Sequence, residues 1–75
     1  MPLKKIEDIK FIPVVERYDY DSDGDLIYAG YADRGTTSSE NKWKISRFTY
    51  DGNKNVVLKE TAYGVWNDRV SLSYI

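Results

Sequence analysis

Two runs of alternating apolar and polar side chains constrain this chain more than any other feature of its sequence. They cover residues 43–50 and 69–75, and each run carries aromatic rings. Such alternation places one set of side chains on a buried sheet face and the other set toward water. The second half of the chain is therefore predicted to be antiparallel sheet, with residues 69–75 as its closing strand.

Three further segments have the composition of strands: residues 11–18, 26–32 and 56–63. The first contains Pro13, which cannot donate a ladder hydrogen bond, so it is an edge strand or begins near Val14. Gly30 marks a bulge in the second. The third follows a turn at residues 51–55, which together with residues 43–50 predicts a hairpin. About five short strands favour an all-β fold, a small antiparallel β-barrel or a two-layer sandwich.

The run at residues 43–50 contains a conflict of parity. Trp43 and Ile45 fall on one face of a strand, whereas Phe48 and Tyr50 fall on the other. Either both faces of this strand are covered, or a bulge near Ser46 changes the register. Both alternatives agree with a closed barrel or a sandwich.

The chain has 75 residues and is predicted to form one domain, close to the size at which a single core is only marginally sufficient. Residues 1–10 are expected to form an N-terminal arm or a short helix, and residues 11–75 the β-domain. We find no internal repeat and no change of composition that would mark a second domain.

Composition excludes several classes of function. The chain has no cysteine and no histidine, which removes disulfides, thiolate and imidazole metal ligands and the usual general base. A net charge of −1 disfavours nucleic acid as a partner. No apolar run is long enough for a signal peptide or a membrane span. We therefore expect no enzymatic activity, no cofactor, no small-molecule substrate and no membrane partner.

Residues 19–25 match the first half of a calcium loop, D-x-D-x-D-G, in which oxygen ligands alternate and Gly24 permits a bend. The twelfth position of such a loop needs a bidentate carboxylate, but this chain has Gly30 there. The flanks are strand-like, whereas an EF-hand needs helices. The preferred interpretation is an acidic β-turn with no metal site, and a calcium-stabilised module remains the alternative.

No catalytic residue is assigned from the sequence. Asp68 beside Arg69 resembles a local ion pair, and Ser71 and Ser73 lie on the expected polar face of the closing strand. A serine needs a neighbouring base to act as a nucleophile, and no such base is available here.

Aromatic residues make up 15% of the chain, including seven tyrosines. Most rings are expected in the core, but seven tyrosines are too many for a core of this size, and tyrosine is favoured at protein interfaces. Six residues expected on edges and loops are predicted to contact a partner: Phe11, Ile12, Tyr18, Tyr20, Tyr31 and Trp66.

Residues 26–75 resemble small uncharacterised proteins encoded by tailed bacteriophages. The resemblance is carried by residues 28–32, by residues 42–53 and by W-N-D-R-x-S-L-S-Y at residues 66–74. It does not reach the extension through Val15. The family has no assigned catalytic residues, and the resemblance implies a small phage product of the virion.

These observations predict a non-catalytic virion structural or accessory protein, acting in capsid decoration, head-to-tail joining or tail-fibre association. It would be made in the host cytoplasm without a signal peptide, and it would bind other virion proteins or itself as a homo-oligomer. The alternative is a phage-encoded intracellular modulator of a host protein, whose acidic segment at residues 19–25 imitates phosphate or engages a basic site.

Overall fold

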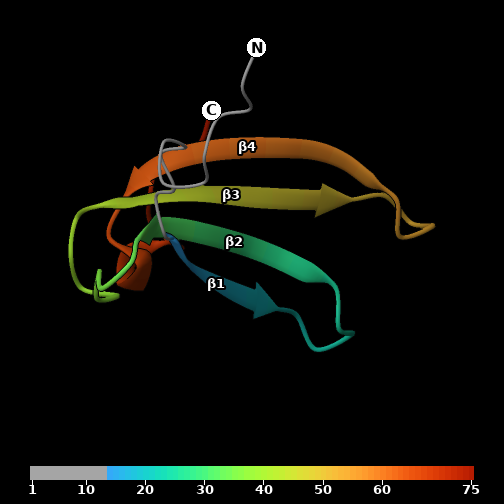
Figure 1. Cartoon of the computed structure of the whole chain (residues 1–75). Coiled ribbons are helices and arrows are strands. Elements are labelled where there is room, and N and C mark those ends of the chain that lie inside the picture. Colours follow the sequence, from blue (N-terminus) through green and yellow to red (C-terminus); the bar gives the residue numbers. More distant parts are fainter. Residues whose placement is uncertain (1–13) are drawn as a thin grey trace, which may run out of the picture.

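The computed structural model describes residues 14–75 and shows an antiparallel meander of four strands in the order β1-β2-β3-β4 (Figure 1). The elements are β1 (Val14–Tyr20), β2 (Leu26–Asp33), β3 (Trp43–Tyr50), β4 (Val56–Gly64) and a short 3-10 helix, η2 (Trp66–Asp68). The predicted arm and the predicted contacts Phe11 and Ile12 lie outside the described residues. The all-β prediction is confirmed.

The predicted barrel or sandwich is wrong, because the sheet is open. Within residues 14–75, no ladder joins β1 to β4. The predicted fifth strand at residues 69–75 is also wrong. In that range only Ile75 pairs with the sheet, through two backbone hydrogen bonds with Thr61 of 2.8 and 3.1 Å. The rest of this segment turns across one face of the sheet and so cannot fill the gap between β1 and β4.

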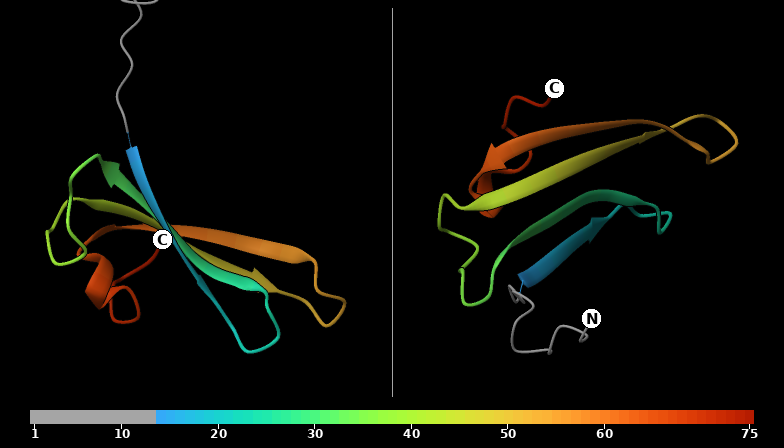
Figure 2. Two further views of the ribbon diagram at one scale, coloured as in Figure 1. Left: turned by 60° about the horizontal axis from the view of Figure 1, so that its bottom comes forward. Right: turned by 45° about the horizontal axis from the view of Figure 1, so that its top comes forward.

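The sheet consists of two hairpins that are joined over a short distance only. The β2–β3 ladder covers four residue pairs, from Tyr28 with Arg47 to Tyr31 with Lys44. Beyond it the hairpins diverge toward their turns (Figures 1 and 2). Near the tips, the Tyr50 hydroxyl donates to the Leu26 carbonyl at 2.7 Å.

One face of the sheet, which we call the covered face, carries the core. The C-terminal segment, residues 65–75, lies against it at the end opposite the two turns (Figures 1 and 2). Trp43 and Ile45 of β3 are 1% and 0% exposed, and the segment adds Trp66 and Tyr74. The buried hydrophobic residues are Ala32, Trp43, Ile45, Ala62, Trp66 and Tyr74.

Small residues on β2 make room for the tryptophan of η2. A Cβ atom added at Gly30 would lie 2.6 Å from Cε3 of Trp66, which is closer than atoms in contact can approach. The register of β2 runs through Gly30 without a shift, so the predicted bulge there is wrong. Gly30 is required for the close approach of an indole ring and not for backbone distortion.

The parity conflict of β3 has a different solution from either alternative. β3 pairs with β4 without a shift from Trp43 to Thr49, and the irregularity lies between Thr49 and Tyr50. Trp43 and Ile45 therefore face the core, while Phe48 is half-buried on the opposite side, which we call the open face. A bulge is present, but it is next to the turn and not near Ser46.

The two hairpins are one structural unit repeated after 30 residues, from Asp21 to Asp51. Every pair in the β1–β2 register has its counterpart in β3–β4: Val15 with Ala32 corresponds to Ile45 with Ala62. The shift before Tyr20 recurs before Tyr50, in the same place relative to the turn. Only a few side chains recur at this spacing, so this repeat of the register is not visible as a repeat in the sequence.

The two turns close through the same hydrogen bonds. Oδ1 of Asp21 accepts the backbone N–H groups of Asp23 and Asp25, each at 2.9 Å. Oδ1 of Asp51 accepts those of Asn53 and Asn55 at 2.8 and 3.0 Å. An aspartate that caps its own turn replaces hydrogen bonds that the bent backbone cannot make for itself.

Candidate protein-binding surface

The open face carries a row of long side chains that crosses all four strands. Cross-strand pairing places Glu16, Tyr31, Lys44 and Tyr63 side by side, one from each strand. Tyr31 is 42% exposed and Tyr63 is 73% exposed. Two large rings thus reach solvent on either side of a cation, and we call these three residues the tyrosine–lysine row.

The charge in this row is held by its aromatic neighbours. The ammonium of Lys44 lies 5.6 Å from the ring centroid of Tyr31, within the range of a cation–π contact. Interaction with the Tyr31 hydroxyl, and more weakly with Tyr63, raises the pKa of Lys44. The row therefore presents a permanent positive charge between two amphipathic rings at neutral pH.

The neighbouring cross-strand row on the open face has small side chains at its centre. Tyr18 pairs across β2, β3 and β4 with Ala29, Ser46 and Thr61, whose side chains are all small. Tyr18 is 51% exposed, and its hydroxyl donates to Oε1 of Glu16 at 2.9 Å. This contact with a carboxylate raises the pKa of Tyr18. The ring is thereby oriented along the strand, toward the tyrosine–lysine row.

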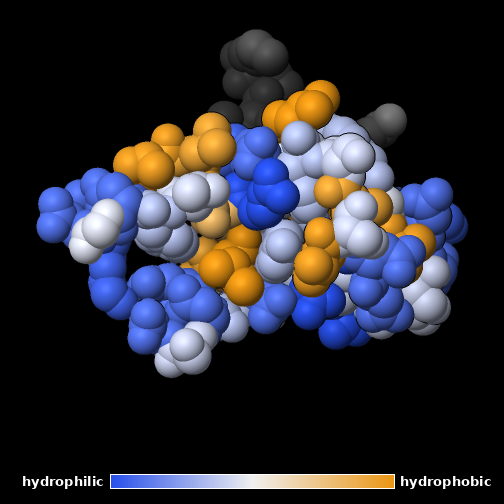
Figure 3. All heavy atoms as spheres, turned by 180° about the vertical axis from the view of Figure 1, so that it is seen from behind, coloured by the Kyte–Doolittle hydropathy of each residue, from blue (hydrophilic) through white to orange (hydrophobic). Residues whose placement is uncertain are grey.

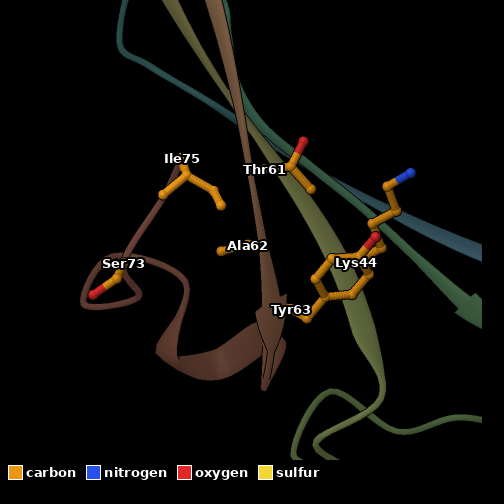
Figure 4. A pocket seen from close by; sticks show the side chains of 6 residues that line it. All are labelled: Lys44, Thr61, Ala62, Tyr63, Ser73 and Ile75. Carbon is orange, nitrogen blue, oxygen red and sulfur yellow. The ribbon is translucent and has the colours of Figure 1, made fainter.

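A hollow of about 460 Å³ lies at the outer edge of β4 (Figure 4). Its lining comes from β3, from β4 and from the C-terminal segment: Lys44, Thr61, Ala62, Tyr63, Ser73 and Ile75. Tyr63 and Lys44 form one side of the hollow, and Ser73 and Ile75 lie on the other. Ile75 is 95% exposed, so an incoming apolar group would meet it directly.

A second apolar surface lies near the tip of the second hairpin. Val56, Val57 and Leu58 at the start of β4 are 53%, 59% and 48% exposed. Seen from behind, the molecule shows apolar side chains in separate patches, with hydrophilic lobes at the two hairpin tips (Figure 3). Exposed apolar residues at a sheet edge are a common element of protein contacts.

Three of the predicted contact residues lie at the surface. Tyr18 and Tyr20 of β1 and Tyr31 of β2 are 51%, 57% and 42% exposed. Tyr31 belongs to the tyrosine–lysine row, and Tyr18 is next to it. Tyr20 stands at the shift beside the first turn and is separated from the row.

Trp66 is not where the sequence placed it. It was expected on an exposed loop, but it lies in η2 and is 6% exposed. Its ring centroid is 5.9 Å from that of Trp43, and the guanidinium of Arg69 lies 4.6 Å above it. The indole is part of the core, so the reason for predicting it as a contact residue was wrong.

Sequence reasoning missed Tyr63 and Lys44. Ala62 and Tyr63 are adjacent in an alternating run, so the sequence indicates that they face opposite sides of the sheet. In the structure, the smaller residue of the two faces the core. Without the strand register, the larger side chain of such a pair is taken as the buried one. The register with Lys44 shows that Tyr63 points to the open face.

Three of the four carboxylates of residues 19–25 already have partners in the fold. Asp19 accepts Nε of Arg69 at 3.0 Å, Asp21 caps the turn, and Asp25 lies 3.4 Å from Nζ of Lys54. Within residues 14–75, no three acidic side chains are grouped as metal ligands. A calcium ion bound in this turn would have to compete with these contacts.

Arg69 is the link between the C-terminal segment and β1. Besides its bond to Asp19, it donates from Nη1 to the Trp66 carbonyl at 3.2 Å, and its own carbonyl accepts the Tyr74 hydroxyl at 2.7 Å. The expected local pair of Arg69 with Asp68 is replaced by this pair with a residue 50 positions earlier. Arg69 thus has a structural role.

Comparison with models of protein families, with curated proteins and with solved structures found no match for this chain.

Among residues 14–75, no helix has the length and hydropathy that a membrane span requires.

Proposed function

We propose that this protein is a non-catalytic binding module that contacts a protein partner through the open face of its sheet. The observation that carries the proposal is the tyrosine–lysine row. Tyr31, Lys44 and Tyr63 come from three adjacent strands, so the ladders fix the points at which their side chains leave the sheet. A preorganised group of rings loses little conformational entropy on binding.

The chemistry of the row defines the partner surface that it suits. Tyrosine offers a large apolar contact and a hydroxyl, and it is enriched among the residues that dominate binding energy. Lys44 adds a positive charge at the centre, so a complementary surface would carry a carboxylate flanked by apolar or aromatic groups. Tyr18 and Glu16 extend this contact surface at the edge formed by β1.

We further propose that the module acts in a phage virion, as a structural or accessory component. Support for this comes from the resemblance of residues 26–75 to small tailed-phage proteins, and binding through a rigid sheet agrees with such a role. Capsid decoration, head-to-tail joining and tail-fibre association all use repeated contacts of one small protein with a larger surface.

Quantitative mass spectrometry of purified phage particles tests the virion proposal. We expect the chain in a constant ratio to the major capsid protein. Its absence from clean particles would overturn the proposal and would favour the intracellular modulator, whose partner is a host protein.

Rebinding to particles tests the surface. We expect Tyr63→Ser to weaken binding of purified chain to particles that lack it, by more than tenfold if Tyr63 is among the dominant contacts. Val70→Ser is the matched control, because Val70 is 74% exposed on the C-terminal segment, outside the open face. Equal binding by both variants, with unchanged melting temperatures, would show that the row is not the contact.

A further inference from the structure

The two outer edges of the sheet are related to each other by the internal repeat. β4 is the counterpart of β2, and β1 is the counterpart of β3. In the chain itself, β2 binds β3 through four residue pairs. The outer edge of β4 therefore repeats an edge that is already known to accept a strand, and β1 repeats the strand that it accepts.

We propose that copies of this chain associate head to tail, with β4 of one copy pairing with β1 of the next in the register that β2 uses with β3. A shift of 30 residues converts the pairs of the internal junction into those of the proposed one. Ala29 with Ser46 becomes Lys59 with Glu16, and Gly30 with Ile45 becomes Glu60 with Val15. The inference concerns the edges and does not depend on the proposed function of the open face.

Charges on the two edges complement each other in this register. Lys59 of one copy lies directly opposite Glu16 of the next, and both are exposed in the single chain. On the covered face, Arg17 of the next copy lies diagonal to Glu60. Opposite charges at directly paired and diagonal positions stabilise antiparallel strands.

The backbone of β4 is oriented to accept the added strand. Thr61 directs both its N–H and its carbonyl outward, where Ile75 binds them at 2.8 and 3.1 Å. Alternate residues of a strand direct these groups to the same side, so those of Lys59 also point outward. Val14 of the next copy, opposite Thr61, would take over the two bonds of Ile75.

This geometry generates an open array and not a closed dimer. The two surfaces in contact are different, so each new copy presents another β4 edge. A two-fold pairing of β4 with β4 centred on Lys59 would instead place two lysines opposite each other. Like charges in that position are destabilising.

Sedimentation velocity of the full chain over a range of concentrations at low salt tests the proposal. We expect concentration-dependent association. Lys59→Glu and Glu16→Lys should each raise the dissociation constant about fivefold to thirtyfold, because a favourable cross-strand pair becomes a repulsive one. The double variant Lys59→Glu with Glu16→Lys should restore association. Lys42→Glu, on an exposed loop outside both edges, is the matched charge-reversal control.

Several outcomes would overturn the proposal. These are a monomer at all concentrations, association that is unchanged by both charge reversals, or a double variant that associates as weakly as the single variants. Stronger association of Lys59→Glu alone would also overturn the proposal, because the proposed register places this variant's carboxylate opposite Glu16. Lys59→Pro gives a second test, because it removes an outward N–H without breaking the β3–β4 ladder. It should abolish association, whereas Lys42→Glu should leave association unchanged.

Discussion

The two hairpins share their register and the form of their turns, but they differ in what covers them. In the first hairpin, Tyr28 packs against Tyr74 of the C-terminal segment, at 5.9 Å between ring centroids. At the counterpart of Tyr28, the second hairpin has Leu58, which is 48% exposed. Turn chemistry therefore sets the pairing of each hairpin, and contacts with a distant segment decide which of two corresponding side chains is buried.

One pair of corresponding positions shows how this difference arises. Gly30 in the first hairpin leaves space for the ring of Trp66. Its counterpart Glu60 is charged and lies 2.7 Å from Nη2 of Arg47. Gly30 has no side chain, whereas the side chain of Glu60 occupies the corresponding space above β4, so an indole cannot approach the backbone there as closely. Trp66 is thus directed to Gly30 and not to the corresponding position of the second hairpin.

Removing the indole of Trp66 should produce the largest loss of stability among the changes that test this comparison. Trp66→Ala deletes an indole that is 6% exposed and should lower the free energy of unfolding by about 3–5 kcal/mol, which approaches the whole stability of a small domain. Urea denaturation followed by circular dichroism measures it. Leu58→Ala in the second hairpin is the control and should cost under about 1 kcal/mol. Similar losses for both would contradict the difference in covering.

A smaller loss is expected at the corresponding glycine and glutamate. Gly30→Ala places a methyl group against Trp66 and should lower the free energy of unfolding by about 1–3 kcal/mol. Glu60→Ala removes a partly exposed ion pair and should cost less. Denaturation of both variants under the same conditions ranks them. The reverse order would show that the ion pair holds the sheet more strongly than the packing of Trp66.

The turns differ at the residue with positive φ, which is Gly24 at 86° in the first and Lys54 at 64° in the second. Placing the residue of one turn in the other turn should change the stability of the protein in opposite directions. Gly24→Lys should destabilise the protein by about 1 kcal/mol, because a side chain with a Cβ is strained in the left-handed region. Lys54→Gly should stabilise it by about 0.5 kcal/mol, since relief of that strain exceeds the added chain entropy.

Lys54 also lies 3.4 Å from Oδ2 of Asp25 and thereby links the two turns. Lys54→Asn separates the two contributions, because asparagine tolerates positive φ but cannot form the ion pair. If Lys54→Gly destabilises the protein and Lys54→Asn does so equally, the link between the tips outweighs the strain in the turn. Thermal melts of the three variants measure this.

The smallest expected effect is the pH dependence of stability that Asp51 causes. Hydrogen bonds from the backbone N–H groups of Asn55 and Asn53 lower the pKa of Asp51. A carboxylate with a lowered pKa in the folded state stabilises the protein above its unfolded pKa of about 4, and this contribution is lost as the pH falls through the folded value. Melting temperatures between pH 6 and pH 2 should fall less steeply for Asp51→Asn.

Glu40 titrates in the same range, because the backbone N–H and hydroxyl of Thr37 lower its pKa. The comparison of Asp51→Asn with the unaltered chain cancels this contribution. Equal slopes in the two proteins would show that the second turn forms without the charge of Asp51.

Sequence patterns located three strands to within one residue at each end. Residues 26–32, 43–50 and 56–63 became Leu26–Asp33, Trp43–Tyr50 and Val56–Gly64. These segments succeeded because alternation and turn residues act locally. The segment 69–75 alternates equally well, but its first residue is drawn toward β1 by the bond of Arg69 to Asp19. A long-range contact of this kind leaves no local pattern.

The surface was harder to predict than the strands. Tyr18, Tyr20 and Tyr31 were selected and are exposed, whereas Trp66 was selected and is buried. The exposure of a ring on a sheet depends on which face another segment covers. That choice followed from the space above Gly30, which no pattern of hydrophobicity records.

The sequence by itself determined the all-β class, the boundaries of three strands and the turns, because alternation, glycine and capping aspartates act within a few residues. Only the tertiary structure decided that the sheet stays open and that its two hairpins are equivalent. It also decided which tyrosines face solvent. These properties depend on register and on contacts across many residues, such as Trp66 over Gly30, where free energy is gained only when distant segments meet.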